Sequence, residues 1–193
     1  MNIIDTLNMM SKILEKRDDF FITTSFGFQS AILFFLFDLL KIKPDTVYIK
    51  TGLTIGDTEK HKKKLQELFD FNLIEYDRQD FLRQQTNGKK FLDLSQAKRQ
   101  TICREIKRDP LLEYIQKKNK TIWISGIRKS QTSNRKDIEF INTSDMGVVK
   151  ISPLANFSDS DLLNISKKYS LPLNEGYKDL CKENPKNECG LHI

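Results

Sequence analysis

Short apolar runs alternate with longer amphipathic stretches along this chain, and the alternation predicts strands interleaved with helices. Apolar positions at helical spacing predict a first helix over residues 3–14. The strands are predicted over residues 19–24, 46–51, 71–76, 121–127 and 148–151. The later helices are predicted over residues 28–42, 57–69, 95–118 and 158–169. This order predicts an α/β fold, with a mostly parallel sheet covered by helices on both faces.

Two local signals refine the helix predictions. Pro110 falls inside the stretch 95–118, so we expect that stretch to be kinked or divided in two. Ser158 precedes the last helix and is a suitable N-terminal cap. Residues 174–193 have little regular pattern, so we expect a mobile C-terminal tail that follows an α/β domain over residues 1–173 and belongs to the same domain.

The composition fits one globular domain in the cytoplasm. The chain has 193 residues, of which 38% are hydrophobic, and its 13 Phe residues supply a sizeable core. The longest apolar run, 31–37, ends at Asp38 and is far shorter than the roughly 20 residues that span a membrane. The first residues lack the basic, apolar and small-residue blocks of an export signal. We therefore expect a cytoplasmic protein that does not interact with membranes.

Charge and cysteine content narrow the chemistry only in part. A net charge of +6 could attract nucleic acid, but it equally suits a small polyanion such as a nucleotide. Three cysteines are too few for a disulfide-rich secreted scaffold. In a reducing compartment such cysteines are core, metal-binding or catalytic residues.

Ligands of parallel α/β sheets bind beyond the carboxyl ends of the strands. The segments at that edge are predicted to be 24–29, 51–57, 128–135 and the chain after Pro172. The first of them, with Thr24, Ser25 and Gly27 before a helix, has the composition of an anion cradle. It is not a Walker loop, because no Gly-Lys-Ser/Thr follows. The alternative is an ordinary strand-to-helix turn with a serine cap.

Cationic side chains gather in two places. The loop 125–135 carries Arg128, Lys129 and Arg135, and arginine binds phosphate or sulfate in a bidentate manner. Helical spacing places Lys107 on one face with Arg104 and Arg108. Either group could simply be solvated, but beside the first loop they favour a polyanionic nucleotide.

The C-terminal segment contains a cysteine in polar, glycine-containing surroundings. Cys189 is followed by Gly190 and His192, and nearby positive charge would lower the pKa of its thiol. Considered alone, Cys189 is either a nucleophile or a free thiol near a frayed end.

Five segments together resemble a known family, the assimilatory phosphoadenylyl-sulfate and adenylyl-sulfate reductases. The C-terminal sequence 188–192 (ECGLH) is similar to the family signature. The segments that resemble it in the same order upstream are 24–29 (TSFGFQ), 125–135 (SGIRKSQTSNR), 150–154 (KISPL) and 171–177 (LPLNEGY). The matches cover residues 23–192. They imply an adenine nucleotide alpha hydrolase-like fold related to the ATP pyrophosphatases, with 1–173 as the nucleotide-binding reductase domain and 174–193 as its catalytic tail.

The resemblance implies reduction of 3′-phosphoadenylyl sulfate to sulfite and adenosine 3′,5′-bisphosphate in sulfate assimilation. The Cys189 thiolate would attack sulfur and form an S-sulfocysteine, from which thioredoxin or glutaredoxin would release sulfite. His192 would assist at the catalytic centre. Residues expected to bind substrate are Thr24, Ser25, Phe26, Gly27, Gln29, Thr51, Gly52, Lys107, Gly126, Arg128, Gln131 and Arg135.

Some residues depart from the family pattern. Lys50 stands where the family usually has aspartate before Thr51 and Gly52. Iron–sulfur members need a Cys-Cys pair and a Cys-x-x-Cys, and neither occurs here. We therefore expect no bound cofactor and no metal site, and we favour the 3′-phosphorylated substrate over plain adenylyl sulfate. A zinc site built from Cys103, Cys181, Cys189 and His192 matches no common spacing.

Other functions remain as alternatives. An adenylating ATP pyrophosphatase would resemble the family fold, but its first loop is richer in glycine and contains an aspartate. An inactive nucleotide-binding homologue is the second alternative, motivated by Lys50. We expect no nucleic-acid partner. The sequence does not decide between a monomer and a homodimer, or whether Cys181 pairs with Cys189.

Overall fold

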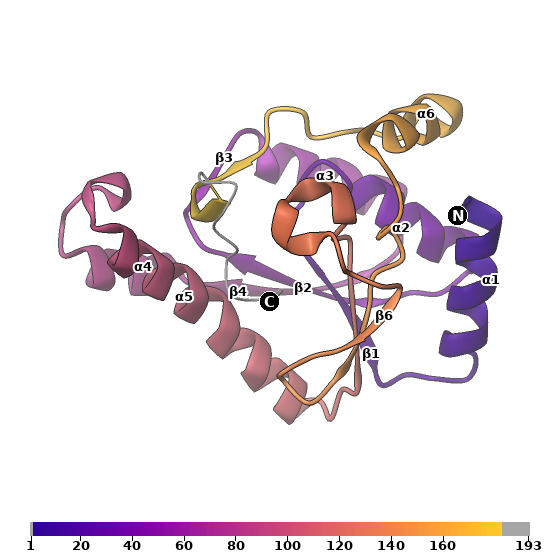
Figure 1. Cartoon of the computed structure of the whole chain (residues 1–193), viewed down its shortest axis with the longest axis horizontal. Helices are drawn as coiled ribbons and strands as arrows, with labels where there is room; N and C mark the ends of the chain where they lie inside the picture. The colour runs from indigo at the N-terminus through magenta and orange to yellow at the C-terminus, as the bar shows by residue number, and fades with distance from the viewer. Residues whose placement is uncertain (1, 183–193) are drawn as a thin grey trace.

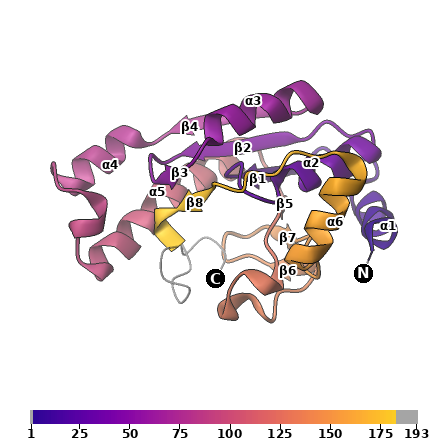
Figure 2. The same ribbon diagram turned by 90° about the horizontal axis from the view of Figure 1, so that it is seen from above.

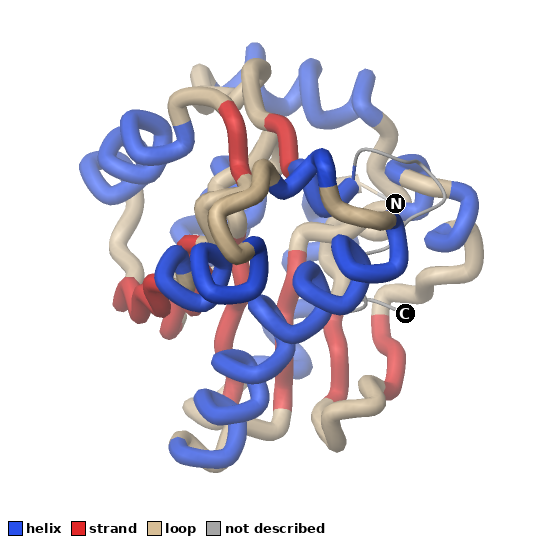
Figure 3. Tube along the Cα trace, turned by 90° about the vertical axis from the view of Figure 1, so that its left-hand side faces the viewer, coloured by secondary structure: helices blue, strands red, loops and turns tan. Residues whose placement is uncertain are grey.

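The computed structural model describes residues 2–182 and shows an α/β fold (Figure 1). Its main sheet has six strands in the order β4-β2-β1-β5-β7-β6. The strands are β1 (Phe20–Thr24), β2 (Asp45–Lys50), β4 (Asn72–Asp77), β5 (Ile122–Ser125), β6 (Ile141–Thr143) and β7 (Val149–Ile151). All neighbouring pairs are parallel except β6 and β7. The strands run side by side with helices around them (Figure 3).

Helices cover both faces of the sheet, as the alternating pattern predicts. They are α1 (Ile3–Leu14), α2 (Ser30–Leu39), α3 (Thr58–Leu68), α4 (Gln79–Thr86), α5 (Gln96–Lys117) and α6 (Asp159–Tyr169). Four 3₁₀ turns are η1 (Phe91–Asp93), η2 (Lys129–Gln131), η3 (Ser133–Arg135) and η4 (Leu180–Lys182). A second, two-stranded antiparallel sheet joins β3 (Thr54–Ile55) to β8 (Lys178–Asp179).

The core lies in two layers, one on each side of the sheet. Residues of α1, α2, α3 and α6 pack with the β1 residue Ile22 on one face. Residues of α5 pack with Phe21, the adjacent β1 residue, on the other face. Figures 1 and 2 show α4 and α5 together at the opposite side of the molecule from α1 and α6. Because successive strand side chains point to opposite faces, the apolar run of β1 fills both layers.

Some local features of residues 2–182 differ from the sequence predictions, and others agree with them. Pro110 does not divide α5, which is continuous over 22 residues. The helix α4 and the edge strand β6 were not predicted. Ser158 does cap α6, because its Oγ accepts the N–H of Asp161 at 3.1 Å. Within residues 2–182 no helix is both long and apolar enough to cross a membrane.

A disulfide joins Cys103 of α5 to Cys181 of η4, with the two Cα atoms 5.7 Å apart. The sequence left the role of both cysteines undecided and raised a Cys181–Cys189 pairing instead. The structure pairs Cys181 with a residue 78 positions away. Among the described residues, no group of three or more His, Cys, Asp or Glu side chains could hold a metal ion.

Candidate functional site

The sheet has its topological switch point between β1 and β5. The chain leaves β1 through α2 to reach β2 on one side, whereas β5, which comes much later in the sequence, pairs with β1 on the other side. The carboxyl edge at such a switch point is where α/β proteins bind ligands. A pocket opens at this place. Its lining residues are Thr23, Thr24, Ser25, Gly27, Gln29, Ser30, Leu33, Val47, Ile49, Lys107, Ser125, Gly126, Ile127, Arg135 and Asp179.

The loop after β1 is shaped by its own side chains. The Phe26 N–H donates to Thr24 Oγ1 at 2.9 Å, and Phe26 has a φ of 51°. This turn directs the Phe26 ring into the core, where it meets the Tyr48 ring edge-on at a centroid distance of 5.0 Å. Phe26 was predicted to bind substrate, but its side chain is fully buried in the core and does not line the pocket.

A chain of two buried hydrogen bonds connects the same loop to α3. The Ser30 hydroxyl donates to the Gly27 carbonyl oxygen at 2.7 Å and lies 3.2 Å from Nε2 of His61. Since the Ser30 proton is used on Gly27, Nε2 of His61 is the donor in that contact. Burial, and then the charge of Lys64, lowers the pKa of His61. A neutral His61 therefore holds the start of α2 in place beneath the pocket.

The loops after β1 and β5 touch each other directly. A Cβ atom added to Gly126 would stand 3.1 Å from Cγ of Gln29. Within the two strands themselves, the indole Nε1–H of Trp123 in β5 donates to Thr23 Oγ1 in β1 at 2.8 Å. Gly126 thus permits the close approach that forms one wall of the pocket.

Two cations reach the pocket from different elements. Lys107 extends from the middle of α5, and Arg135 comes from η3 in the loop after β5. Arg135 is buried, and its guanidinium donates to Oε1 of Gln131. Lys107 Nζ lies 2.8 Å from Asp179 Oδ2. Hydroxyls, glycines and two cations at a helix start form a suitable site for phosphate or sulfate.

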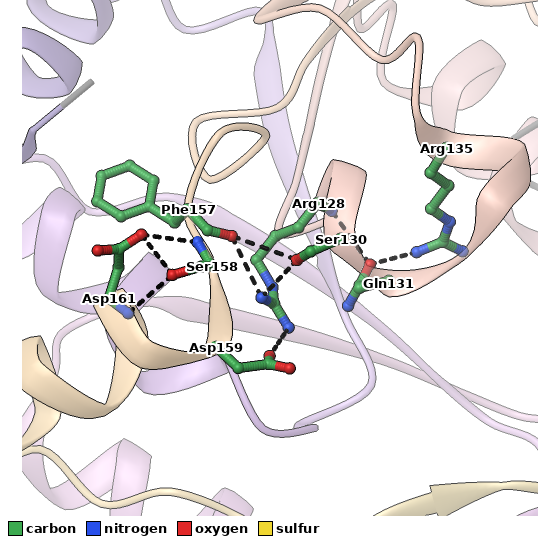
Figure 4. A network of polar contacts seen from close by, with 8 residues as sticks. All are labelled: Arg128, Ser130, Gln131, Arg135, Phe157, Ser158, Asp159 and Asp161. Atoms are coloured by element: carbon green, nitrogen blue, oxygen red, sulfur yellow. Dashed lines mark hydrogen bonds and ion pairs between the residues drawn. The ribbon is translucent and has the colours of Figure 1, made fainter.

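Arg128 was predicted to bind substrate, and in the structure its guanidinium lies against the start of α6. Its guanidinium donates to the Phe157 carbonyl at 3.2 Å and to Asp159 Oδ1 at 2.5 Å (Figure 4). The Arg128 N–H donates to Gln131 Oε1, which also accepts from Arg135. Arg128 therefore ties the loop after β5 to the start of α6 and does not line the pocket. Gln131 does not line it either, but it connects Arg128 to Arg135.

The remaining predicted residues fall into two groups. Thr24, Ser25, Gly27, Gln29, Lys107, Gly126 and Arg135 come together around the pocket. Thr51 and Gly52 do not line it, and Thr51 Oγ1 instead accepts the Leu53 N–H at 3.1 Å. Lys50, which departs from the family pattern, does not line the pocket either. Cys189 and His192 lie outside the described residues.

The segment 174–182 lies across the first loop. The buried side-chain amide of Asn174 donates to the Phe26 carbonyl at 2.9 Å. A Cβ atom on Gly27 would stand 3.2 Å from the Tyr177 ring, so Gly27 leaves just enough space for that ring. The mobile tail predicted from residue 174 onwards therefore does not begin there, because residues 174–182 pack on the site. Residues 183–193 lie outside the description.

Several residues of the site were not predicted from the sequence. Asp179 lines the pocket with its side chain almost fully buried, yet an acidic residue gave no signal in a predicted anion site. His61 lies 31 positions from Ser30, in a helix that is rich in lysine. The hydroxyl of Ser30 could have been found, since it follows the recognised loop directly.

Three comparisons place this architecture among known proteins. A family model described as phosphoadenosine phosphosulfate reductase domain matches residues 19–182. The adenosine 5′-phosphosulfate reductase of Geobacillus thermodenitrificans (strain NG80-2) is 27% identical over 204 residues, covering 93% of this chain and 86% of that protein.

Two solved structures share the fold. The crystal structure of phosphoadenylyl-sulfate reductase from Candida auris, in a phosphate complex, superposes with a TM-score of 0.70 at 16% identity, over 88% of this chain and 82% of that one. NMN synthetase from Francisella tularensis gives a TM-score of 0.60 at 17% identity, over 88% and 70% of the two chains. These likenesses confirm the predicted adenine nucleotide alpha hydrolase-like fold.

Proposed function

Because the chain belongs to the phosphoadenosine phosphosulfate reductase family, we propose that it reduces an adenylylated sulfate to sulfite with the nucleotide held in the β1–β5 pocket. The observation that carries the proposal is the pocket itself. At the switch point it combines a hydroxyl- and glycine-bearing loop with Lys107 and Arg135. The relatives that are named adenosine 5′-phosphosulfate reductases support the same reaction.

The pocket offers separate features for the parts of such a substrate. The hydroxyl-bearing residues Thr24 and Ser25 belong to the loop that leads into α2, whose positive end attracts an anion. Arg135 and Lys107 supply two further charges for the phosphosulfate. Apolar side chains that line the pocket, among them Leu33 and Val47, suit the adenosine rather than the charged groups of the substrate.

The proposed chemistry uses Cys189 as the nucleophile, as the sequence predicts. Its thiolate attacks the sulfur, an S–S bond forms, and the S–O bond to the phosphate breaks, so that the adenosine phosphate leaves. His192 and the pocket cations stabilise the charge that develops on the departing oxygens. The product on the enzyme is an S-sulfocysteine.

Release of sulfite needs a dithiol. A thiolate of thioredoxin or glutaredoxin attacks Sγ of Cys189 and expels sulfite, and its second thiol then breaks the mixed disulfide. Sulfur gains two electrons and the dithiol loses two. Such a reductant works in the reducing cytoplasm, where we propose that the reaction takes place.

The 3′-phosphate distinguishes two substrates. The lack of a full set of cluster cysteines favours the 3′-phosphorylated form, whereas the relatives at 27% identity are named for the plain form. We propose the 3′-phosphorylated substrate, with plain adenylyl sulfate as the direct competitor in the assay.

The test is sulfite release with a thioredoxin system and each nucleotide in turn. We expect sulfite from wild type and none from Cys189→Ser. A parallel assay with ATP and Mg²⁺ tests for ATP cleavage, because a protein that shares the fold is named as a synthetase. Cleavage of ATP, with no sulfite released from either sulfonucleotide, would contradict the reductase and indicate an adenylating enzyme instead.

A further inference from the structure

Two links join α5 to the segment before the C-terminus at the edge of the pocket. The Cys103–Cys181 disulfide is the first, and both residues are buried. The ion pair of Lys107 with Asp179, at 2.8 Å, is the second. Cys103 and Lys107 are one helical turn apart, and Asp179 and Cys181 are two residues apart. The two links therefore hold the same part of α5 to the same short segment. We call the four residues Cys103, Lys107, Asp179 and Cys181 the clamp.

The disulfide and the carboxylate are coupled through the backbone. The Cys181 N–H donates to Asp179 Oδ1 at 3.0 Å, while Oδ2 of the same carboxylate contacts Lys107. The segment is also held by the two residue pairs between β3 and β8, by the bond from Leu180 N–H to the Leu53 carbonyl at 2.9 Å, and further upstream by the Asn174 amide on the Phe26 carbonyl. A two-stranded pairing of this length is marginal by itself. The disulfide adds a covalent link between α5 and the residues next to Asp179, and so favours the contact of Asp179 with Lys107.

Asp179 carries a negative charge, which is unfavourable for an anionic ligand in this pocket. Its side chain is 3% exposed and lines a site whose other charged residues, among those that the structure describes, are Lys107 and Arg135. A carboxylate there repels phosphate or sulfate and competes with it for the Lys107 ammonium. A ligand with several negative charges must displace the carboxylate or tolerate it.

We propose that the clamp is a redox-sensitive control of ligand affinity, with Asp179 as the residue that positions Lys107. In the disulfide form the carboxylate stays on Lys107 and weakens nucleotide binding. Reduction releases the segment and makes the Lys107 charge available to the ligand. The inference rests on the proposed function for the class of ligand, a sulfonucleotide or its product.

The reductive step needs only a dithiol or a phosphine. A thiolate of the dithiol attacks one sulfur of the Cys103–Cys181 bond, and its second thiol completes the exchange. Two electrons and two protons pass to the protein, which gains two thiols, and the dithiol becomes a disulfide. The proposed reaction already consumes a reductant of this class, so the same supply would open the clamp and support turnover.

The test measures nucleotide affinity in the full chain carrying Cys189→Ser, so that Cys103 and Cys181 are the only cysteines. Adenosine 3′,5′-bisphosphate and adenosine 5′-monophosphate are titrated by calorimetry into the oxidised protein and into protein reduced with a phosphine. Peptide mass confirms the disulfide before and its absence after reduction. We expect reduction to lower Kd by about tenfold, a size ordinary for coupling between two sites.

Substitutions separate the charge from the covalent bond. Asp179→Asn in the oxidised protein keeps an oxygen for the Cys181 N–H but removes the charge, so Kd should fall without reduction and change little on reduction. The exposed residue Glu67, on α3, gives the matched control Glu67→Gln with the same loss of charge. Reciprocity predicts that saturating nucleotide makes the disulfide easier to reduce by the same factor, or about 30 mV for a two-electron couple.

The outcomes separate the clamp from the reductase activity. Equal Kd in the two redox states, tighter binding in the oxidised state, or no disulfide in the peptide mass would overturn the clamp. No nucleotide binding in either state would overturn the clamp and the proposed function together. Nucleotide binding that depends on the redox state, without any sulfite release, would support the clamp and contradict the proposed reductase activity.

Discussion

Gly126 and Gln29 meet so closely that a Cβ atom on Gly126 would stand 3.1 Å from Cγ of Gln29. This contact joins the loop after β5 to the loop after β1, although 97 positions separate the two residues in the sequence. The wall of the pocket is therefore one packed surface made from two loops. Its shape depends on the missing side chain at position 126.

Gly126→Ala should strain this wall. Gln29 must move by a few tenths of an ångström, and overpacking of this kind costs roughly 1–3 kcal/mol. We expect a lower free energy of unfolding and weaker nucleotide binding, measured by denaturation and calorimetry. Gly176→Ala is the matched control, because a Cβ atom there meets nothing within 4 Å. Equal effects of the two substitutions would contradict the close approach at Gly126.

Arg128→Gln should act on stability. The guanidinium is buried against the Phe157 carbonyl and Asp159, and hydrogen bonds that involve a charged group contribute roughly 1.5–3 kcal/mol each. We expect a loss of about 2 kcal/mol in denaturant unfolding. The control Arg83→Gln removes the same charge from an exposed position and should change stability by less than about 0.5 kcal/mol. Full stability with lost nucleotide binding would instead support the direct ligand role predicted from sequence.

Arg135→Gln should act mainly on binding. Arg135 lines the pocket, and a lost charge-assisted contact to phosphate corresponds to roughly a ten- to hundredfold rise in Kd. Because one cation fewer faces the ligand, affinity should also depend less on salt. Titrations at two salt concentrations, with Arg83→Gln as the control of equal net charge, test this expectation. An unchanged Kd would show that Arg135 does not contact the bound anion.

His61 should make stability fall below neutral pH. Its folded pKa is lowered by burial and by Lys64, so the folded state disfavours a proton that the unfolded chain binds below about pH 6.5. The stabilisation from neutral His61 is therefore lost as pH decreases from about 6.5 towards the folded pKa. Unfolding at pH 7.5 and pH 5.5 should show a larger loss for wild type than for His61→Gln. Equal losses would show that His61 does not titrate differently on folding.

The sequence predicted much of the fold because local patterns determine it. The apolar strand β1 and the apolar helix α2 fill both layers of the core, so their burial is visible in composition. The order of strands and helices then places the loops after β1 and β5 at one edge. Helix α4 was not predicted because its residues 79–86 are mostly polar and only Thr86 is buried.

The parts that could not be predicted depend on distant contacts. The direction of the Phe26 side chain follows from a backbone turn with positive φ, which the loop sequence does not reveal. The pairing of Cys103 with Cys181 and of Lys107 with Asp179 joins residues that are more than 70 positions apart. Arg128 belongs to a basic loop that suits an anion, but Asp159 and the Phe157 carbonyl bind it instead.

The most direct test of the reductase is the mass of the protein after incubation with each sulfonucleotide in the absence of any reductant. We predict that wild type gains one sulfite group, that the group maps to the peptide containing Cys189, and that Cys189→Ser gains none. Addition of a thioredoxin system should then remove the group and release sulfite. An unchanged mass with both nucleotides, or an equal gain on Cys189→Ser, would contradict the proposed reaction.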